Sequence, residues 1–129
     1  MTFTASQSTA ITSCVRHLLL LAARSHDWHL KTTSYAQHMA LGELYPYCHD
    51  AADRLAETAM GAGYIPPTPA ATAAATFTSP STAIPGIEAM CKELEDLQER
   101  VRDNAWYANI VQEVQGSLYG ILYKLKRLS

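Results

Sequence analysis

The spacing of apolar residues predicts two amphipathic helices in the first half of the chain. Apolar side chains recur every three or four residues over residues 8–29, at Ile11, Val15, Leu18, Leu19 and Ala22. The same period returns over residues 33–60, where Thr32, Thr33 and Ser34 are candidate N-caps and Gly61 suits the C-terminal end. Pro46 removes one backbone donor inside this second helix, so we expect the helix to bend there rather than to end.

The second half of the chain predicts another pair of helices. An apolar stripe over residues 87–103 consists of Ile87, Met90, Cys91, Leu94, Leu97 and Val101. A further stripe covers residues 106–127 and ends in three cations that complement the helix dipole. Asp103 and Asn104 offer a break between the two helices. Since no alternating strand pattern competes anywhere, the predicted fold class is all-α.

Residues 62–85 separate the two helical pairs and differ from both in composition. These 24 residues hold seven Ala, five Thr and five Pro and no charged residue, so we expect neither a regular helix nor a strand. The preceding helix is on the order of 42 Å long, whereas an extended chain of this length reaches roughly 79 Å. We therefore expect a long crossover that sets the third helix parallel to the second. A four-helix bundle with one such crossover is a ferritin-like topology.

Composition narrows the class of protein further. The 129 residues are 48% apolar with a formal charge of -2, which suits one domain over residues 1–129. The longest apolar run, residues 18–23, is far short of the roughly 20 residues that span a bilayer. Residues 1–8 lack the basic start and apolar stretch of a signal peptide. We therefore expect a cytoplasmic protein without a membrane span.

Four residues have the types and the spacing of a metal site, namely His26, His38, Asp53 and Glu57. The histidines flank the turn between the first two predicted helices, and the carboxylates are four residues apart and share a helix face. His38 and Asp53 are roughly 22 Å apart along one helix, so a single chain does not bring all four to one ion. A two-fold dimer with antiparallel second helices would place the histidines of one chain beside the carboxylates of the other. Such mixed ligation suits iron, zinc or manganese.

Other interpretations of these residues stay open. A local site of His49, Asp53 and Glu57 on one helix face competes with the shared site. We expect His29 at the surface and His17 in the core or in an interface. The three cysteines form no CxxC pair and are expected as buried free thiols: Cys14, Cys48 and Cys91.

The ligand pattern resembles that of the Dps-type miniferritins. That family has a His beside a Trp, a second His 12 residues on, an Asp 15 further and a Glu four after that, and these intervals match here. Two segments look like those of the small Dps-like proteins of bacteriophages, KTTSYAQHMALGELY at residues 31–45 and LYGILYKL at residues 118–125. The family usually has an acidic ligand four residues after the second His, where this chain has Gly42.

The resemblance implies a ferritin-like fold and a ferroxidase that binds iron at two-fold interfaces. It places His26 and His38 on one side of each site and Asp53 and Glu57 of the mate on the other. The implied partner is a second copy of the chain, in a dimer or in a dodecameric shell, within the host cytoplasm if a phage encodes the protein. DNA is not an expected partner, because the chain is slightly acidic and has no basic N-terminal arm. The alternative is a non-catalytic ferritin-like assembly or phage accessory or scaffold protein with a degenerate metal site, which Gly42 and Pro46 favour.

Overall fold

Four long helices account for most of the chain in the computed structural model, which describes residues 2–67 and 77–128. They are α1 (Ala5–Lys31), α2 (Tyr35–Gly61), α3 (Ala83–Arg100) and α4 (Ala105–Arg127), with the short 3-10 helix η1 (Pro80–Thr82) ahead of α3. The described residues contain no strand, so the predicted all-α class is confirmed. None of the helices in these two segments is long and apolar enough to cross a membrane.

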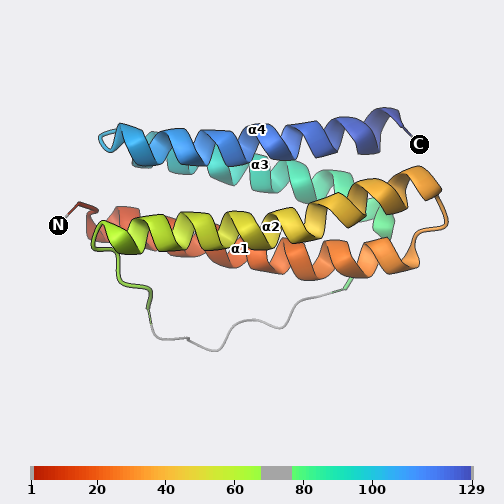
Figure 1. The fold of residues 1–129 in the computed structure, drawn as a ribbon, viewed down its shortest axis with the longest axis horizontal. Coiled ribbons are helices and arrows are strands. Elements are labelled where there is room, and N and C mark those ends of the chain that lie inside the picture. Colours follow the sequence, from red (N-terminus) through yellow and green to blue (C-terminus); the bar gives the residue numbers. More distant parts are fainter. Residues whose placement is uncertain (1, 68–76, 129) are drawn as a thin grey trace.

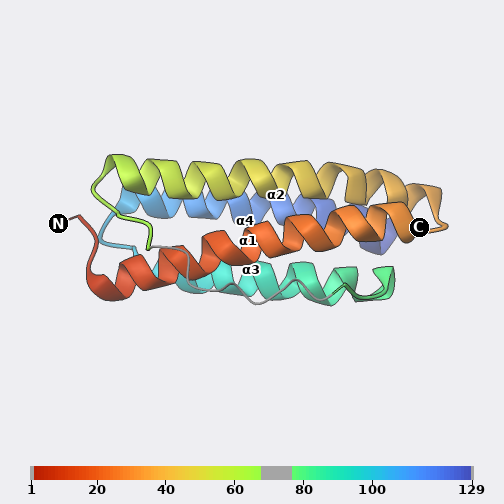
Figure 2. The same cartoon turned by 90° about the horizontal axis from the view of Figure 1, so that it is seen from below.

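The helices form a bundle in which α1 and α4 occupy one diagonal and α2 and α3 the other. α1 packs against α2 and α3, and α4 packs against the same two helices. Each packed pair is antiparallel, and α2 and α3 run in the same direction, as predicted (Figures 1 and 2). α2 therefore ends at the opposite end of the bundle from the start of α3 (Figure 1). Of the predicted crossover over residues 62–85, residues 68–76 lie outside the described residues.

One apolar core runs between the four helices and uses all four predicted stripes. Its largest fully buried side chains are Trp28, Tyr107, Ile11, Leu18, Leu41, Leu44, Leu55, Ile87, Leu94, Leu97, Leu118 and Val101. The Tyr107 hydroxyl donates a hydrogen bond to the Leu55 carbonyl at 2.7 Å, so this buried polar group is satisfied. The cysteines are buried and free, as predicted.

The helix boundaries differ from the prediction where the ends have their own chemistry. α1 begins at Ala5 rather than near residue 8, because Thr4 and Gln7 form a capping box ahead of the apolar stripe. The Thr4 amide donates to Gln7 Oε1 at 2.9 Å, and the Gln7 amide donates to Thr4 Oγ1 at 3.1 Å. α3 begins at Ala83 rather than near residue 87, because Pro85 falls in the first turn, where no amide donor is needed.

Pro46 leaves α2 as one helix. The helix continues on both sides of the proline, and its ribbon changes direction between its orange and yellow parts (Figure 1). A proline ring removes the hydrogen bond to the carbonyl four residues earlier, here that of Gly42, and bends a helix at that point. The helix therefore bends at the proline without breaking, as predicted.

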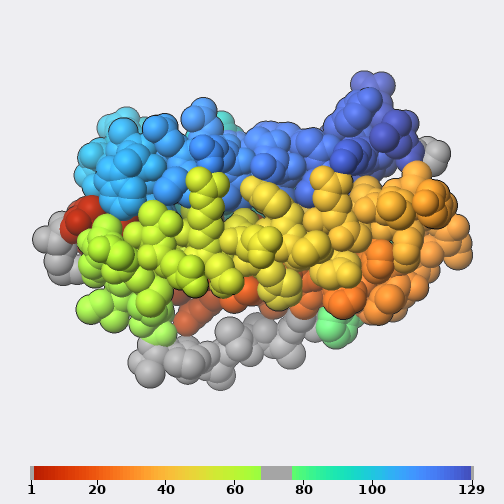
Figure 3. Space-filling model, viewed as in Figure 1, coloured from red at the N-terminus to blue at the C-terminus, as the bar shows by residue number. Residues whose placement is uncertain are grey.

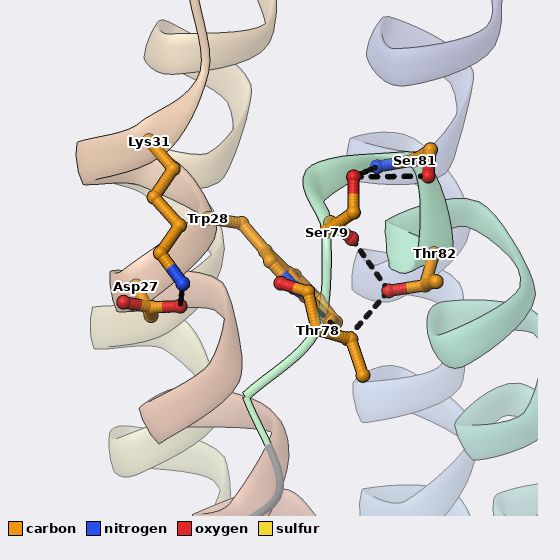
Figure 4. A network of polar contacts seen from close by, with 7 residues as sticks. All are labelled: Asp27, Trp28, Lys31, Thr78, Ser79, Ser81 and Thr82. Atoms are coloured by element: carbon orange, nitrogen blue, oxygen red, sulfur yellow. Dashed lines mark hydrogen bonds and ion pairs between the residues drawn. The ribbon is translucent and has the colours of Figure 1, made fainter.

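Trp28 anchors the segment ahead of η1 against α1. The ring is 2% exposed, and its Nε1–H donates to the Thr78 carbonyl at 3.1 Å. The hydroxyl of Thr78 in turn lies 2.7 Å from that of Thr82 (Figure 4). Asp27 pairs with Lys31 at 2.7 Å on the same end of α1 (Figure 4). These contacts hold in place the helix end that carries His26.

Candidate functional site

The turn between α1 and α2 brings histidines of both helices together. His26 and His29 lie one turn apart near the end of α1, and His38 lies in the first turns of α2. The rings of His29 and His38 stack, with centroids 3.7 Å apart and planes 19° apart. His29, which we expected at the surface, is half-buried in this stack.

His29 and His38 are also joined by two reciprocal hydrogen bonds. Nδ1 of His29 lies 2.8 Å from the His38 carbonyl oxygen, and Nδ1 of His38 lies 2.8 Å from that of His29. Because a carbonyl oxygen only accepts, each Nδ1 must carry the hydrogen. In the neutral ring this leaves a lone pair on each Nε2. Metal-ligating histidines are generally held in this way, with the second ring nitrogen donating to a backbone or carboxylate oxygen.

Tyr45 closes the other side of this group of rings. It stacks on His26 with centroids 4.0 Å apart and planes 8° apart, and it meets His29 edge-on at 5.5 Å. The His26 and His29 centroids are 6.3 Å apart. We call His26, His29, His38 and Tyr45 the imidazole cluster.

Gly42 gives the imidazole cluster its space. A Cβ atom at this position would lie 3.0 Å from Cε1 of His29 and 3.2 Å from its Nδ1. Any larger residue would therefore push the His29 ring away from α2. Gly42 stands where the Dps family usually has an acidic ligand, and the structure gives the position a steric role.

The stacked rings limit how His29 and His38 can act on a metal. An ion lies in the plane of each imidazole that binds it, about 2.0–2.1 Å from the nitrogen. The two rings are stacked with centroids 3.7 Å apart and planes inclined by only 19°, so their nitrogens do not point to one ion at such a distance, and this pair does not chelate one ion as arranged. Within one chain, no group of three or more His, Cys, Asp or Glu side chains among the described residues could hold a metal ion.

Asp53 and Glu57 lie farther along α2, on its exposed face. Neither carboxylate makes a hydrogen bond or ion pair within residues 2–67 and 77–128. His38 precedes Asp53 by 15 residues on the same helix, roughly 22 Å along its axis. One chain therefore brings the histidines together and leaves the two carboxylates apart from them.

Two other histidines of the sequence analysis lie outside the imidazole cluster. His49 is exposed four residues before Asp53, without forming a group of three ligands in the described chain. His17 is exposed rather than buried, and its Nδ1 lies 2.6 Å from Oε2 of Glu93. Ser13 donates to the other oxygen of that carboxylate at 2.9 Å. His17 therefore belongs to a contact between α1 and α3.

The residues that sequence reasoning missed did carry a signal. His38, Gly42 and Tyr45 follow at intervals of four and three, which places them on one face of α2. His26 and His29 are three residues apart and share a face of α1 in the same way. The faces on either side of a three-residue turn meet, so examining both faces together would have placed His29 and Tyr45 in the cluster.

The architecture and the imidazole cluster define a four-helix bundle protein with a histidine-rich helix end. The chain belongs to the family described as a family of unknown function (DUF5856), whose model matches residues 29–125. That segment starts at His29 and includes His38, Asp53 and Glu57. No curated protein and no solved structure matches the chain.

Proposed function

We propose that the chain is a Dps-like protein that binds ferrous iron and oxidises it at sites shared across a two-fold dimer. The observation that carries the proposal is the 2.8 Å hydrogen bond from His38 Nδ1 to the His29 carbonyl. It fixes the ring and leaves Nε2 as the free nitrogen, the arrangement of a metal ligand. His26, exposed on the neighbouring helix end, supplies the second imidazole.

The carboxylates of a second copy complete the proposed site. Asp53 and Glu57 are exposed and have no partner among the described residues, so they are free to bind a cation of another chain. With the α2 helices antiparallel, His38 of one copy lies opposite Asp53 and Glu57 of the other, and the reverse holds at a second site.

This register places the two-fold axis at Pro46, midway along α2 between His38 and the carboxylates. Large apolar side chains are exposed at both ends of this face of α2, where a second copy could bury them. Tyr35 is 77% exposed, Met39 55% and Met60 47%. Large apolar side chains at this exposure favour a covered surface over a free one. The same register brings the Tyr35 end of one copy toward the Met60 end of the other.

The fold supports a ferritin-like protein over other helical bundles. Parallel α2 and α3 require a connection that returns along the bundle, the arrangement found in ferritin-like folds (Figure 1). In such bundles, metal sites are built from imidazole and carboxylate groups on neighbouring helices.

The proposed chemistry assigns separate tasks to the two kinds of ligand. Neutral imidazoles of His26 and His38 bind ferrous iron, and the carboxylates of Asp53 and Glu57 offset the charge that grows as iron is oxidised. Each of two ferrous ions gives one electron to peroxide and becomes ferric, and the peroxide takes up two solvent protons and leaves as two water molecules. Zinc and manganese suit the same ligands and would compete for them.

An anaerobic ferrous titration followed by peroxide tests the proposal. Saturable binding and rapid oxidation are expected, with both lost in His38→Ala and in Asp53→Ala. His17→Ala and Asp96→Ala are matched controls, because both side chains are exposed and lie outside the proposed site. Binding that is absent, or equal in all five proteins, would rule out the shared iron site.

The second candidate function is a non-catalytic ferritin-like assembly, such as a phage scaffold protein. The observation that favours it is the stack of His29 on His38, whose planes do not converge on one ion. Gly42, which leaves room for the His29 ring, also stands at the position of the acidic ligand usual in the Dps family. A native mass measurement with metal analysis separates the two functions, because a metal-free oligomer favours the assembly and an iron-loaded one favours the ferroxidase.

A further inference from the structure

The outer face of α4 carries two glycines that the bundle itself does not require. Gly116 and Gly120 are exposed in the middle of a 23-residue helix, and a Cβ atom on either would have nothing within 4 Å. Glycine lowers helix stability relative to alanine, so it is expected where a close approach needs it. Gly42 has such a reason inside the chain, whereas these two do not.

The same face of α4 is aromatic and carries no charge before Arg127 in the last turn. Tyr119 is 50% exposed and Tyr123 is 57% exposed, and both are adjacent on the helix surface to the two glycines. The charged side chains of α4 up to Lys126 are each bound to a neighbouring helix. The pairs are Glu113–Arg54 (2.7 Å), Lys124–Glu43 (2.7 Å) and Lys126–Glu88 (3.4 Å). We define the α4 face as Gln112, Gly116, Tyr119, Gly120 and Tyr123.

We propose that the α4 face binds the same face of a second copy of this chain, as an antiparallel two-fold pair. If Tyr119 lies opposite Gly120 of the second copy, a step of four residues along both helices places Tyr123 opposite Gly116. The symmetry repeats both contacts in the other direction, so four tyrosine rings each meet a glycine. Each ring then fills the space that an absent side chain leaves on the facing helix.

The α4 face is complementary to itself, and for this reason we propose a second copy of the chain as its binding partner. An isologous contact needs a surface that is complementary to itself, and the spacing of Tyr119, Gly120, Gly116 and Tyr123 meets that condition in one register. The absence of unpaired charge between Ala105 and Lys126 in the described helix removes the like-charge repulsion that a symmetric contact would otherwise create. Tyrosine is also enriched at protein interfaces.

The α4 face is separate from the exposed face of α2. The two faces belong to different helices, and the surface of α4 lies above that of α2 in Figure 3. This proposal stands whether or not the chain binds iron. If both faces bind copies, each chain has two partners, and the protein assembles beyond a dimer.

Cysteine cross-linking tests the register directly in the full chain. Gly120→Cys, beside the proposed axis, should form a disulfide-linked dimer on mild oxidation. An equal mixture of Gly116→Cys and Tyr123→Cys should cross-link at least tenfold faster than either variant alone. In the mixture the two cysteines face each other, whereas in either variant alone each cysteine is seven residues away from its counterpart in the second copy. Ser117→Cys is the matched control, since it is exposed on the same helix but turned by about 100° from Gly116.

A charge placed on the face tests the contact itself. Gly116→Arg and Gly120→Arg should each raise the dissociation constant of this pair at least tenfold in sedimentation equilibrium, while Ser117→Arg should not. Arginine favours a helix more than glycine does, so lost association would not come from unfolding. Circular dichroism confirms the folded state. A monomer at high concentration, unchanged association of both arginine variants, or cross-linking of Gly120→Cys no faster than Ser117→Cys would overturn the proposal.

Discussion

His29 occupies the space that the missing side chain of Gly42 leaves on α2. A Cβ atom at position 42 would lie 3.0 Å from Cε1 of the imidazole, closer than nearly all such contacts. The ring is held there by its stack on His38 and by its hydrogen bond to the His38 carbonyl. Gly42 and His29 are therefore one structural unit, although they belong to different helices.

Replacing Gly42 should reveal this coupling in a double-mutant cycle. Gly42→Ala alone should fail to stabilise the protein, because the new Cβ displaces His29 and its hydrogen bond. In a His29→Ala background the same change should add about 1 kcal/mol to the free energy of unfolding, the usual gain of alanine over glycine in a helix. Urea unfolding of the four proteins measures the cycle. Equal effects of Gly42→Ala in both backgrounds would contradict the coupling.

Trp28→Phe should destabilise the bundle by about 1–3 kcal/mol, because it removes a buried hydrogen bond and leaves the Thr78 carbonyl without its donor. Trp106→Phe is the control, since Trp106 is 44% exposed and the change should be nearly neutral. Thermal unfolding followed by circular dichroism compares the two. Equal losses of stability would show that Trp28 does not anchor the segment ahead of η1.

The helices could be predicted from the sequence because their apolar stripes are long and regular. Leu18, Leu55, Leu94 and Leu118 each continue a repeat of three and four residues, and each is fully buried. The ends were harder, because they depend on single contacts such as the Thr4–Gln7 capping box.

The imidazole cluster was predicted only in part. His26 and His38 were assigned from their spacing, but a spacing does not say which rings meet across a turn. His29 came into the cluster because Gly42 makes room for it, a tertiary contact between residues 13 apart in the sequence. The contacts of Asp53 and Glu57 with another chain are an intermolecular property and stay a prediction.

The stability of the protein should fall in alkali partly through Cys48. Burial raises the pKa of this thiol from 9.0 to about 12, so the unfolded chain ionises first. Its contribution is complete below pH 9 and is lost progressively as the pH rises toward 12, by about 1.4 kcal/mol at pH 10. Cys48→Ala should therefore lose less stability than the natural chain between pH 8 and 10 in urea unfolding. Identical pH dependence would show that the thiol ionises alike in both states.

The proposed axis at Pro46 predicts a contact between like residues of two chains. Pro46 is exposed at the middle of α2, so Pro46→Cys should form a disulfide-linked dimer without added metal. Lys92→Cys, exposed on α3, is the control and should stay uncross-linked. Non-reducing electrophoresis after mild oxidation measures both. Cross-linking without iron binding would support the proposed dimer and contradict the ferroxidase function. The two results are separable because the position of the two-fold axis depends on how the α2 helices pair and not on the metal. Iron binding without cross-linking would instead place the site outside this dimer, since Asp53 and Glu57 reach His38 only in the antiparallel register.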